Sequence, residues 1–136
     1  MSKLSHKTKK RLKKELNTIL EELKGKDDEN KAIIVEGIKD KRALKEIGLN
    51  NVYTLHGDVR RIARFLKEKG IKKAYILTDF DRRGKELAEK IKGELTAQAI
   101  DFDLEKRKRF GAILNIKYWE TAEKKLEKFL EKIEGE

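Results

Sequence analysis

Residues 77–85 read Leu77-Thr78-Asp79-Phe80-Asp81-Arg82-Arg83-Gly84-Lys85, and residues 33–37 read Ile33-Ile34-Val35-Glu36-Gly37. In both stretches a short apolar run ends in acidic residues, and a glycine follows. A continuous apolar run of this length is typical of a strand that is buried on both faces, as in a parallel sheet. Ligands of open parallel sheets bind at the carboxyl ends of the strands. The two stretches therefore predict acidic side chains at a binding edge.

Strands and helices alternate on either side of these stretches. Strands are predicted at 32–35, 52–55, 74–78 and 97–102, and helices at 41–47, 58–69 and 84–92, the last ending at Gly93. This alternation predicts an α/β fold, a Rossmann-like four-stranded parallel sheet with helices on both faces and further helices at each end of the chain. Strands 32–35 and 74–78 are expected to be neighbours, because that arrangement brings Glu36 to the aspartates.

Three parts of the chain differ in pattern. Residues 1–28 are predicted to be a basic N-terminal helical extension, residues 29–109 the α/β core, and residues 110–136 a C-terminal helix packed on the core, with Trp119 in its packing stripe. Residues 1–14 carry seven basic groups and no acidic one. They are either a solvated tail or an arm that binds phosphate.

The composition limits the class of protein. The 136 residues include 35 Lys and Arg against 25 Asp and Glu, a net charge of +10, and no cysteine, which excludes disulfides and thiolate chemistry. The charge favours a polyanionic partner, although a Lys- and Glu-rich thermophile surface is the alternative. No apolar run approaches the roughly 18 residues of a membrane span, and the basic N-terminus lacks the apolar part of a secretory signal. No membrane partner and a cytoplasmic location are therefore expected.

The aspartate pair suggests a magnesium site. Asp79 and Asp81 flank one residue at a strand end, so both carboxylates can face one hard cation, Mg²⁺ or alternatively Mn²⁺. Glu36 would join them if its strand is adjacent. Helix capping is the competing explanation for Asp81 and for Asp58, but it accounts for neither Asp79 nor Glu36.

This order, Glu36-Gly37 with Asp40 and then Asp79-Phe80-Asp81, resembles the Toprim domain of topoisomerases, bacterial primases and a ribosomal-RNA maturation nuclease. The resemblance covers about residues 29–109 and is strongest to the small stand-alone Toprim proteins of archaea and some bacteria. It implies that Glu36 is the catalytic acid or base or a metal ligand, and that Asp79 and Asp81 hold Mg²⁺. Some members carry a third acidic residue where Arg83 stands, so the resemblance leaves open one or two metal ions.

The resemblance leaves two functions open. A complete topoisomerase or primase is not expected, because each needs additional domains beside this one. A Mg²⁺-dependent nuclease or other phosphotransfer enzyme remains, with RNA processing the main expectation and RNA favoured over DNA. The alternative is a non-catalytic nucleic-acid-binding module that keeps a Mg²⁺–phosphate site.

Paired basic residues follow each of the first three strands. Because positive side chains oppose the dipole in a first helical turn, their repetition there favours contact with a phosphate backbone. Chance in so basic a chain is the competing explanation. The predicted nucleic-acid-binding residues are Lys41, Arg42, Arg60, Arg61, Arg82 and Arg83.

Overall fold

The computed structural model describes residues 4–24 and 30–134. The helices are α1 (His6–Lys24), α2 (Ile38–Glu46), α3 (Val59–Glu68), α4 (Arg82–Ala97), α5 (Glu105–Leu114) and α6 (Ala122–Glu134), with a 3₁₀ turn η1 (Trp119–Thr121). The strands are β1 (Lys31–Val35), β2 (Val52–Thr54), β3 (Lys73–Ile76) and β4 (Asp101–Asp103). Strand and helix alternate from β1 to β4, as the sequence predicts.

The four strands form one parallel sheet in the order β2-β1-β3-β4. The α/β fold and the adjacency of β1 and β3 are thus confirmed, with Ile34 paired to Ile76. Since Glu36 and Asp79 each lie just beyond these paired strands, the topology brings them to the same edge. The carboxyl ends of β1, β2 and β3 carry the loops that lead into α2, α3 and α4.

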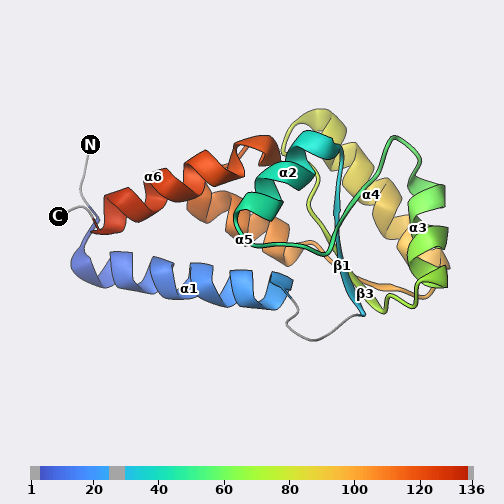
Figure 1. The fold of residues 1–136 in the computed structure, drawn as a ribbon, viewed down its shortest axis with the longest axis horizontal. Coiled ribbons are helices and arrows are strands. Elements are labelled where there is room, and N and C mark those ends of the chain that lie inside the picture. Colours follow the sequence, from blue (N-terminus) through green and yellow to red (C-terminus); the bar gives the residue numbers. More distant parts are fainter. Residues whose placement is uncertain (1–3, 25–29, 135–136) are drawn as a thin grey trace.

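Helices cover both faces of the sheet (Figure 1). One face is covered by helices α1, α2, α5 and α6, and the strand residues that point toward them are Ile33, Val35, Tyr75 and Leu77. The other face is covered by α3 and α4, which pack over Ala32, Ile34, Ala74 and Ile76. Alternate residues of β1 and β3 therefore enter two separate hydrophobic clusters, as expected of central strands.

The two ends of the chain are integrated with the first of these clusters. Leu16, Ile19 and Leu23 of α1 and Phe129 of α6 belong to it. The predicted boundary at residue 109 falls inside α5, whose Phe110 is also in that cluster. The division into extension, core and terminal helix stays a prediction. Residues 1–3 and 25–28 of the predicted extension, residue 29 of the predicted core, and residues 135–136 lie outside the described residues.

Several predicted boundaries are wrong. Gly93 does not end α4, which continues to Ala97 because Leu95 extends the buried stripe of Ala88 and Ile91. The fourth strand accordingly begins at Asp101 rather than at residue 97. Residues 105–114, for which no helix is predicted, form α5, and α2 begins at Ile38 rather than at residue 41. Trp119 lies in η1 before α6 and is fully buried, which confirms its packing role.

None of the helices in the described part of the chain is long and apolar enough to cross a membrane.

Candidate functional site

Glu36 and Asp79 meet at the carboxyl edge of the sheet. The backbone N–H of Asp79 donates to Oε2 of Glu36 over 2.8 Å, a contact between residues 43 apart in the chain. The hydrogen bond uses one carboxylate oxygen of Glu36 and orients the side chain toward the end of β3. Two of the three predicted metal-binding residues are therefore in direct contact.

The main chain after β3 is held by side chains from the C-terminal third of the protein. The carbonyl oxygen of Thr78 accepts from Nε of Arg107 at 2.8 Å and from Nε1 of Trp119 at 2.9 Å. Arg107 also donates to the carbonyl oxygen of Asp79 at 2.6 Å, and the backbone N–H of Trp119 donates to Oδ1 of Asp79 at 2.9 Å. The position of Asp79 is thus set by α5 and η1 as well as by its own strand.

Phe80, between the two aspartates, faces the same C-terminal elements. Its ring centroid lies 5.7 Å from that of Trp119, and the Arg107 guanidinium carbon lies 4.4 Å from the ring centroid. A side-chain carbon on Gly111 would collide with the end of this ring. Glycine at position 111 therefore allows α5 to pack directly against Phe80.

Asp81 begins α4. Its Oδ1 accepts from the backbone N–H of Gly84 at 2.8 Å, so the capping function expected of Asp81 is present. Gly84 lies so close to Asp79 that an added side-chain carbon would overlap the main chain of Asp79. The hydroxyl of Thr78 donates to the carbonyl oxygen of Gly84 at 2.7 Å, closing the turn. Capping and metal binding are compatible because the cap uses one oxygen of Asp81.

Asp40 adds a further carboxylate that the sequence analysis did not include in the site. It lies in the first turn of α2, is only 8% exposed, and accepts from the backbone N–H of Gly37 at 3.1 Å. Burial, with a smaller contribution from the charge of Glu36, raises the pKa of Asp40. Its position three residues after Gly37, where a capping box would form, is the sequence signal that could have identified it.

Negative charge accumulates at Asp79. Burial, together with the charges of Asp40, Glu36 and Asp81, raises the pKa of Asp79 to about 7, although the hydrogen bond from Trp119 acts in the opposite direction. The nearby guanidinium of Arg107 binds carbonyl oxygens instead of a carboxylate. The positive charge of Arg107 still acts on Asp79, Glu36 and Asp81, so it offsets part of the negative charge of the cluster when Asp79 ionises.

The donor set suits a hard divalent cation. Glu36, Asp79 and Asp81 each use one carboxylate oxygen to accept from a backbone N–H, which leaves the second oxygen of each for an ion. Mg²⁺ prefers such oxygen ligands and keeps several waters. Within residues 4–24 and 30–134, however, no three acidic or histidine side chains are already arranged around one metal position. Binding of one ion by three of these side chains would thus require side-chain movements.

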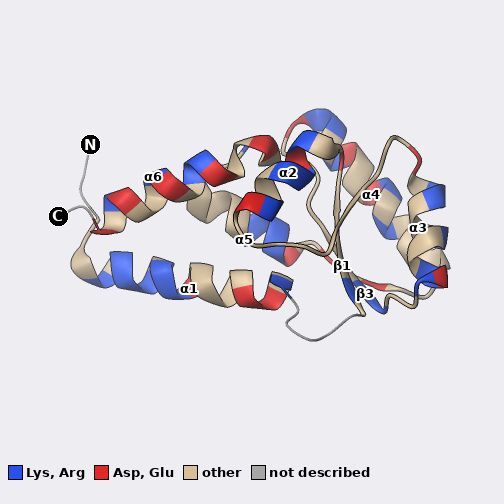
Figure 2. Ribbon diagram, viewed as in Figure 1, with Lys and Arg blue, Asp and Glu red and all other residues tan. Residues whose placement is uncertain are grey.

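The predicted basic residues lie around this edge. Lys41 and Arg42 are in α2, Arg60 and Arg61 begin α3, and Arg82 and Arg83 begin α4; all except the half-buried Lys41 are exposed. Figure 2 shows the positive segments at the starts of these helices. The α2 pair lies on one face of the sheet, and the α3 and α4 pairs on the other. Arg82 also forms an exposed ion pair with Glu86 at 3.2 Å.

Sequence reasoning missed the roles of Arg107 and Trp119. Arg107 belongs to the basic run 106–109, and nothing in that run distinguishes it from its neighbours. The contacts join Thr78 to residues 29 and 41 positions later, so no local spacing could reveal them. Half-burial of Arg107 is visible only in the folded chain.

Known proteins resemble this chain in sequence and in structure. A UPF0292 protein of Methanocaldococcus jannaschii is 38% identical over 84 residues, which are 60% of this chain and 65% of the relative. This chain thus spans slightly less than two thirds of that relative. A UPF0292 protein of Archaeoglobus fulgidus is 32% identical over 117 residues, 85% of this chain and 90% of the relative. These archaeal relatives fit the thermophile composition.

A solved structure shares the fold. A putative protein from Aquifex aeolicus, 31% identical, superposes with a TM-score of 0.65 over 77% of this chain and 95% of its own. The family description that matches residues 31–116, from β1 through the end of α5, is the Toprim domain. That segment contains Glu36, Asp40, Asp79 and Asp81. The chain therefore belongs to the Toprim domain family.

Proposed function

We propose that this protein is a Mg²⁺-dependent phosphotransfer protein of the nuclease type that processes RNA. Membership of the Toprim family supports a metal-dependent role connected with nucleic acids. The observation that carries the finer proposal is the contact between Glu36 and Asp79, surrounded by exposed basic residues. Cleavage of a phosphodiester is assisted by a cation at its oxygens and by a group that moves a proton.

Each carboxylate has a role in this proposal. Asp79 and Asp81 would hold the ion through the oxygens that their backbone partners leave available, and Mg²⁺ would stabilise charge on the phosphate. Glu36 would act as the acid or base, since its carboxylate is positioned by the Asp79 amide and retains one oxygen. The basic residues at the starts of α2, α3 and α4 would orient the backbone of the strand.

The proposal is tested with labelled RNA and DNA of the same sequence, incubated with Mg²⁺, with Mn²⁺ and with EDTA. We expect metal-dependent cleavage, faster on RNA. Glu36→Gln should abolish cleavage while retaining affinity, and the double variant Asp79→Asn/Asp81→Asn should lose both cleavage and its thermal response to Mg²⁺. Glu89→Gln, at an exposed glutamate of α4, is the matched control.

The result also separates the two candidate functions. Binding that requires Mg²⁺ without cleavage of any substrate would support the non-catalytic module and contradict the nuclease. Cleavage that survives both EDTA and Glu36→Gln would contradict the metal-dependent mechanism altogether.

A further inference from the structure

Two adjoining hollows lie along α3, at the β2 edge of the sheet. One is an open depression of about 470 Å³, and the other is a smaller cavity of about 190 Å³ between α3 and β2. They share Arg61 and Phe65. We call the smaller one the β2–α3 pocket; its lining includes Lys41, Tyr53, His56, Arg61 and Phe65.

The β2–α3 pocket has an aromatic wall. Phe65 is 48% exposed, an unusual exposure for a phenylalanine in a helix whose other apolar residues Ile62 and Leu66 are buried. Its ring is tilted against Tyr53 of β2, with centroids 5.9 Å apart. The exposed ring of Phe65 therefore offers a face on which a flat, partly polar group can stack, with the Tyr53 ring beside it.

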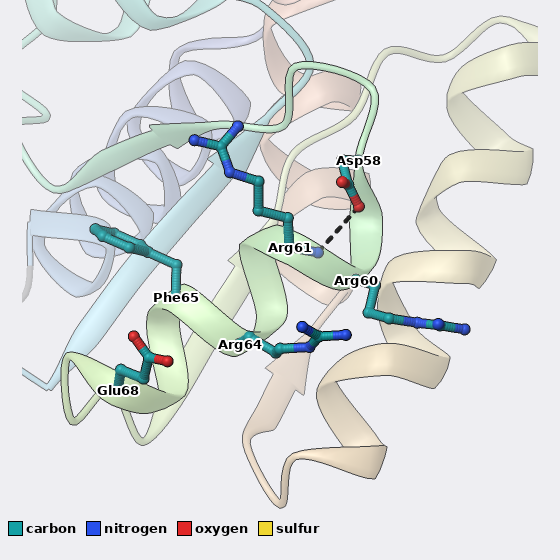
Figure 3. A pocket seen from close by; sticks show the side chains of 6 residues that line it. All are labelled: Asp58, Arg60, Arg61, Arg64, Phe65 and Glu68. Carbon is teal, nitrogen blue, oxygen red and sulfur yellow. Dashed lines mark hydrogen bonds between the residues drawn. The ribbon is translucent and has the colours of Figure 1, made fainter.

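The surroundings of this wall are cationic. Arg61 and Phe65, one helical turn apart, point to the same side of α3 in Figure 3, while Arg60 and Arg64 form a second row. Within the described residues, none of these three guanidinium groups has an ion pair or hydrogen bond. The carboxylate of Asp58 is engaged in capping, accepting from the backbone N–H of Arg61 at 3.0 Å.

The pocket adjoins the carboxylate site. The backbone N–H of Leu55, in the pocket wall, donates to the carbonyl oxygen of Val35 at 2.9 Å, and Glu36 follows Val35 directly. Neighbouring strands are about 4.8 Å apart, so the end of β2 lies one strand from Glu36. A chain with a phosphate at the carboxylates would therefore have its adjacent nucleotides within reach of the pocket.

We propose that the β2–α3 pocket binds an unpaired base of single-stranded nucleic acid, stacked on the exposed ring of Phe65 with Tyr53 beside it, and with Arg61 and Lys41 on the flanking phosphates. This inference rests on the proposed function and adds a preference for single strands. Aromatic rings accept any base by stacking, and cations supply affinity without sequence specificity. A paired base inside a duplex cannot present its face to such a wall.

The test measures fluorescence anisotropy with a labelled oligouridylate, an abasic strand of the same length and a duplex. Phe65→Leu keeps apolar bulk but removes the ring face, and should weaken oligouridylate binding at least about fivefold, the lower end for stacking of one base. Affinity for the abasic strand and the duplex should not change. Phe102→Leu is the matched control, because Phe102 lies on the opposite edge strand beside Lys92 and is also partly exposed.

A second variant tests the phosphate contact. Arg61→Gln should weaken binding of oligouridylate and abasic strand alike, and should reduce the slope of log affinity against log salt by about 0.7. An unchanged slope would contradict the role of Arg61. Melting temperatures near that of wild type for both variants are expected, because both side chains are exposed.

The outcomes separate this inference from the proposed function. If wild type binds and cleaves RNA while Phe65→Leu binds oligouridylate equally well, the pocket inference is overturned and the nuclease stands. If Phe65→Leu loses as much affinity for the abasic strand as for oligouridylate, the pocket inference is also overturned, since no base would then be involved. If wild type binds no nucleic acid, both proposals fail.

Discussion

Asp79→Asn should stabilise the metal-free protein at alkaline pH. The substitution removes the negative charge but keeps an oxygen that can accept from the backbone N–H of Trp119. The pKa of Asp79 is raised to about 7 from the ordinary 3.8, chiefly by burial. Its protonated form is thus favoured by the fold, and its ionisation opposes the fold.

The sign and the size of this effect on stability follow from the linkage between folding and protonation of Asp79. Because the folded chain holds this proton more tightly than the unfolded chain, the contribution to stability is complete below about pH 4 and is lost as pH rises through about 7. At about 1.4 kcal/mol per pH unit the full loss is at most about 4 kcal/mol. Since Asp79 is only half-buried and water screens it, about 2 kcal/mol is expected.

Urea unfolding in EDTA at a series of pH values measures this effect. The difference in unfolding free energy between Asp79→Asn and wild type should be near zero at pH 4 and rise to about 2 kcal/mol by pH 8.5. Asp101→Asn, at an exposed carboxylate at the start of β4, is the control and should give a flat difference. Adding Mg²⁺ at pH 8.5 should then stabilise wild type but not Asp79→Asn.

Two results would refute this reasoning. A flat difference between Asp79→Asn and wild type from pH 4 to 8.5 would mean that the fold does not disfavour ionised Asp79. A difference that becomes more negative as pH rises would mean that the charge of Asp79 is satisfied within the protein, and would remove the electrostatic case for a cation at this edge.

Three further substitutions test the packing around the site. Gly84→Ala should lower the unfolding free energy by about 1–3 kcal/mol, because the new methyl group overlaps the main chain of Asp79. Gly93→Ala, in open space on the same helix, should raise the unfolding free energy by about 0.5–1 kcal/mol. Equal effects of the two substitutions in urea unfolding would contradict the close approach of Gly84 to Asp79. Gly111→Ala should destabilise by about 1–3 kcal/mol through collision with the ring of Phe80, and most of this loss should disappear in a Phe80→Leu background, as a double-mutant cycle would measure. Asp58→Ala should lower the unfolding free energy by about 1 kcal/mol, because it removes the cap of α3, and should leave the thermal shift produced by Mg²⁺ unchanged. A changed thermal shift would show that this cap is coupled to the carboxylate site.

The alternation of apolar runs and amphipathic helices was enough to predict the sheet and its parallel strands. Ile33-Ile34-Val35 and Ala74-Tyr75-Ile76-Leu77 are buried on both faces, so their composition alone marks them as central. The fourth strand was misplaced because Asp101–Asp103 has one apolar residue, Phe102, and lies at an edge. The other edge strand, β2, was predicted because residues 52–55 keep apolar side chains that Asp101–Asp103 lacks.

The carboxylate residues of the site could be predicted from the sequence, but the residues that hold the backbone beside them could not. Glu36 and Asp79 follow their strands directly, so strand order alone brings them together. Arg107 and Trp119 reach the same point from α5 and η1, through packing of Phe110 and Phe80 that no local pattern expresses. Long-range hydrogen bonds to main-chain oxygens depend on tertiary packing, which explains why these two residues were overlooked.

Arg107 and Trp119 explain how the loop after β3 keeps its conformation beside several clustered carboxylates. Four carboxylates lie near one strand end, and the charges of Asp40, Glu36 and Asp81 add to burial, the larger cause, in raising the pKa of Asp79. The repulsion would spread the loop after β3 if only local contacts held it. Arg107 and Trp119 instead bond the carbonyl oxygens and one carboxylate oxygen there, using neutral main-chain partners. These hydrogen bonds hold the backbone after β3 in place, while the second carboxylate oxygens of Glu36, Asp79 and Asp81 remain available to a cation.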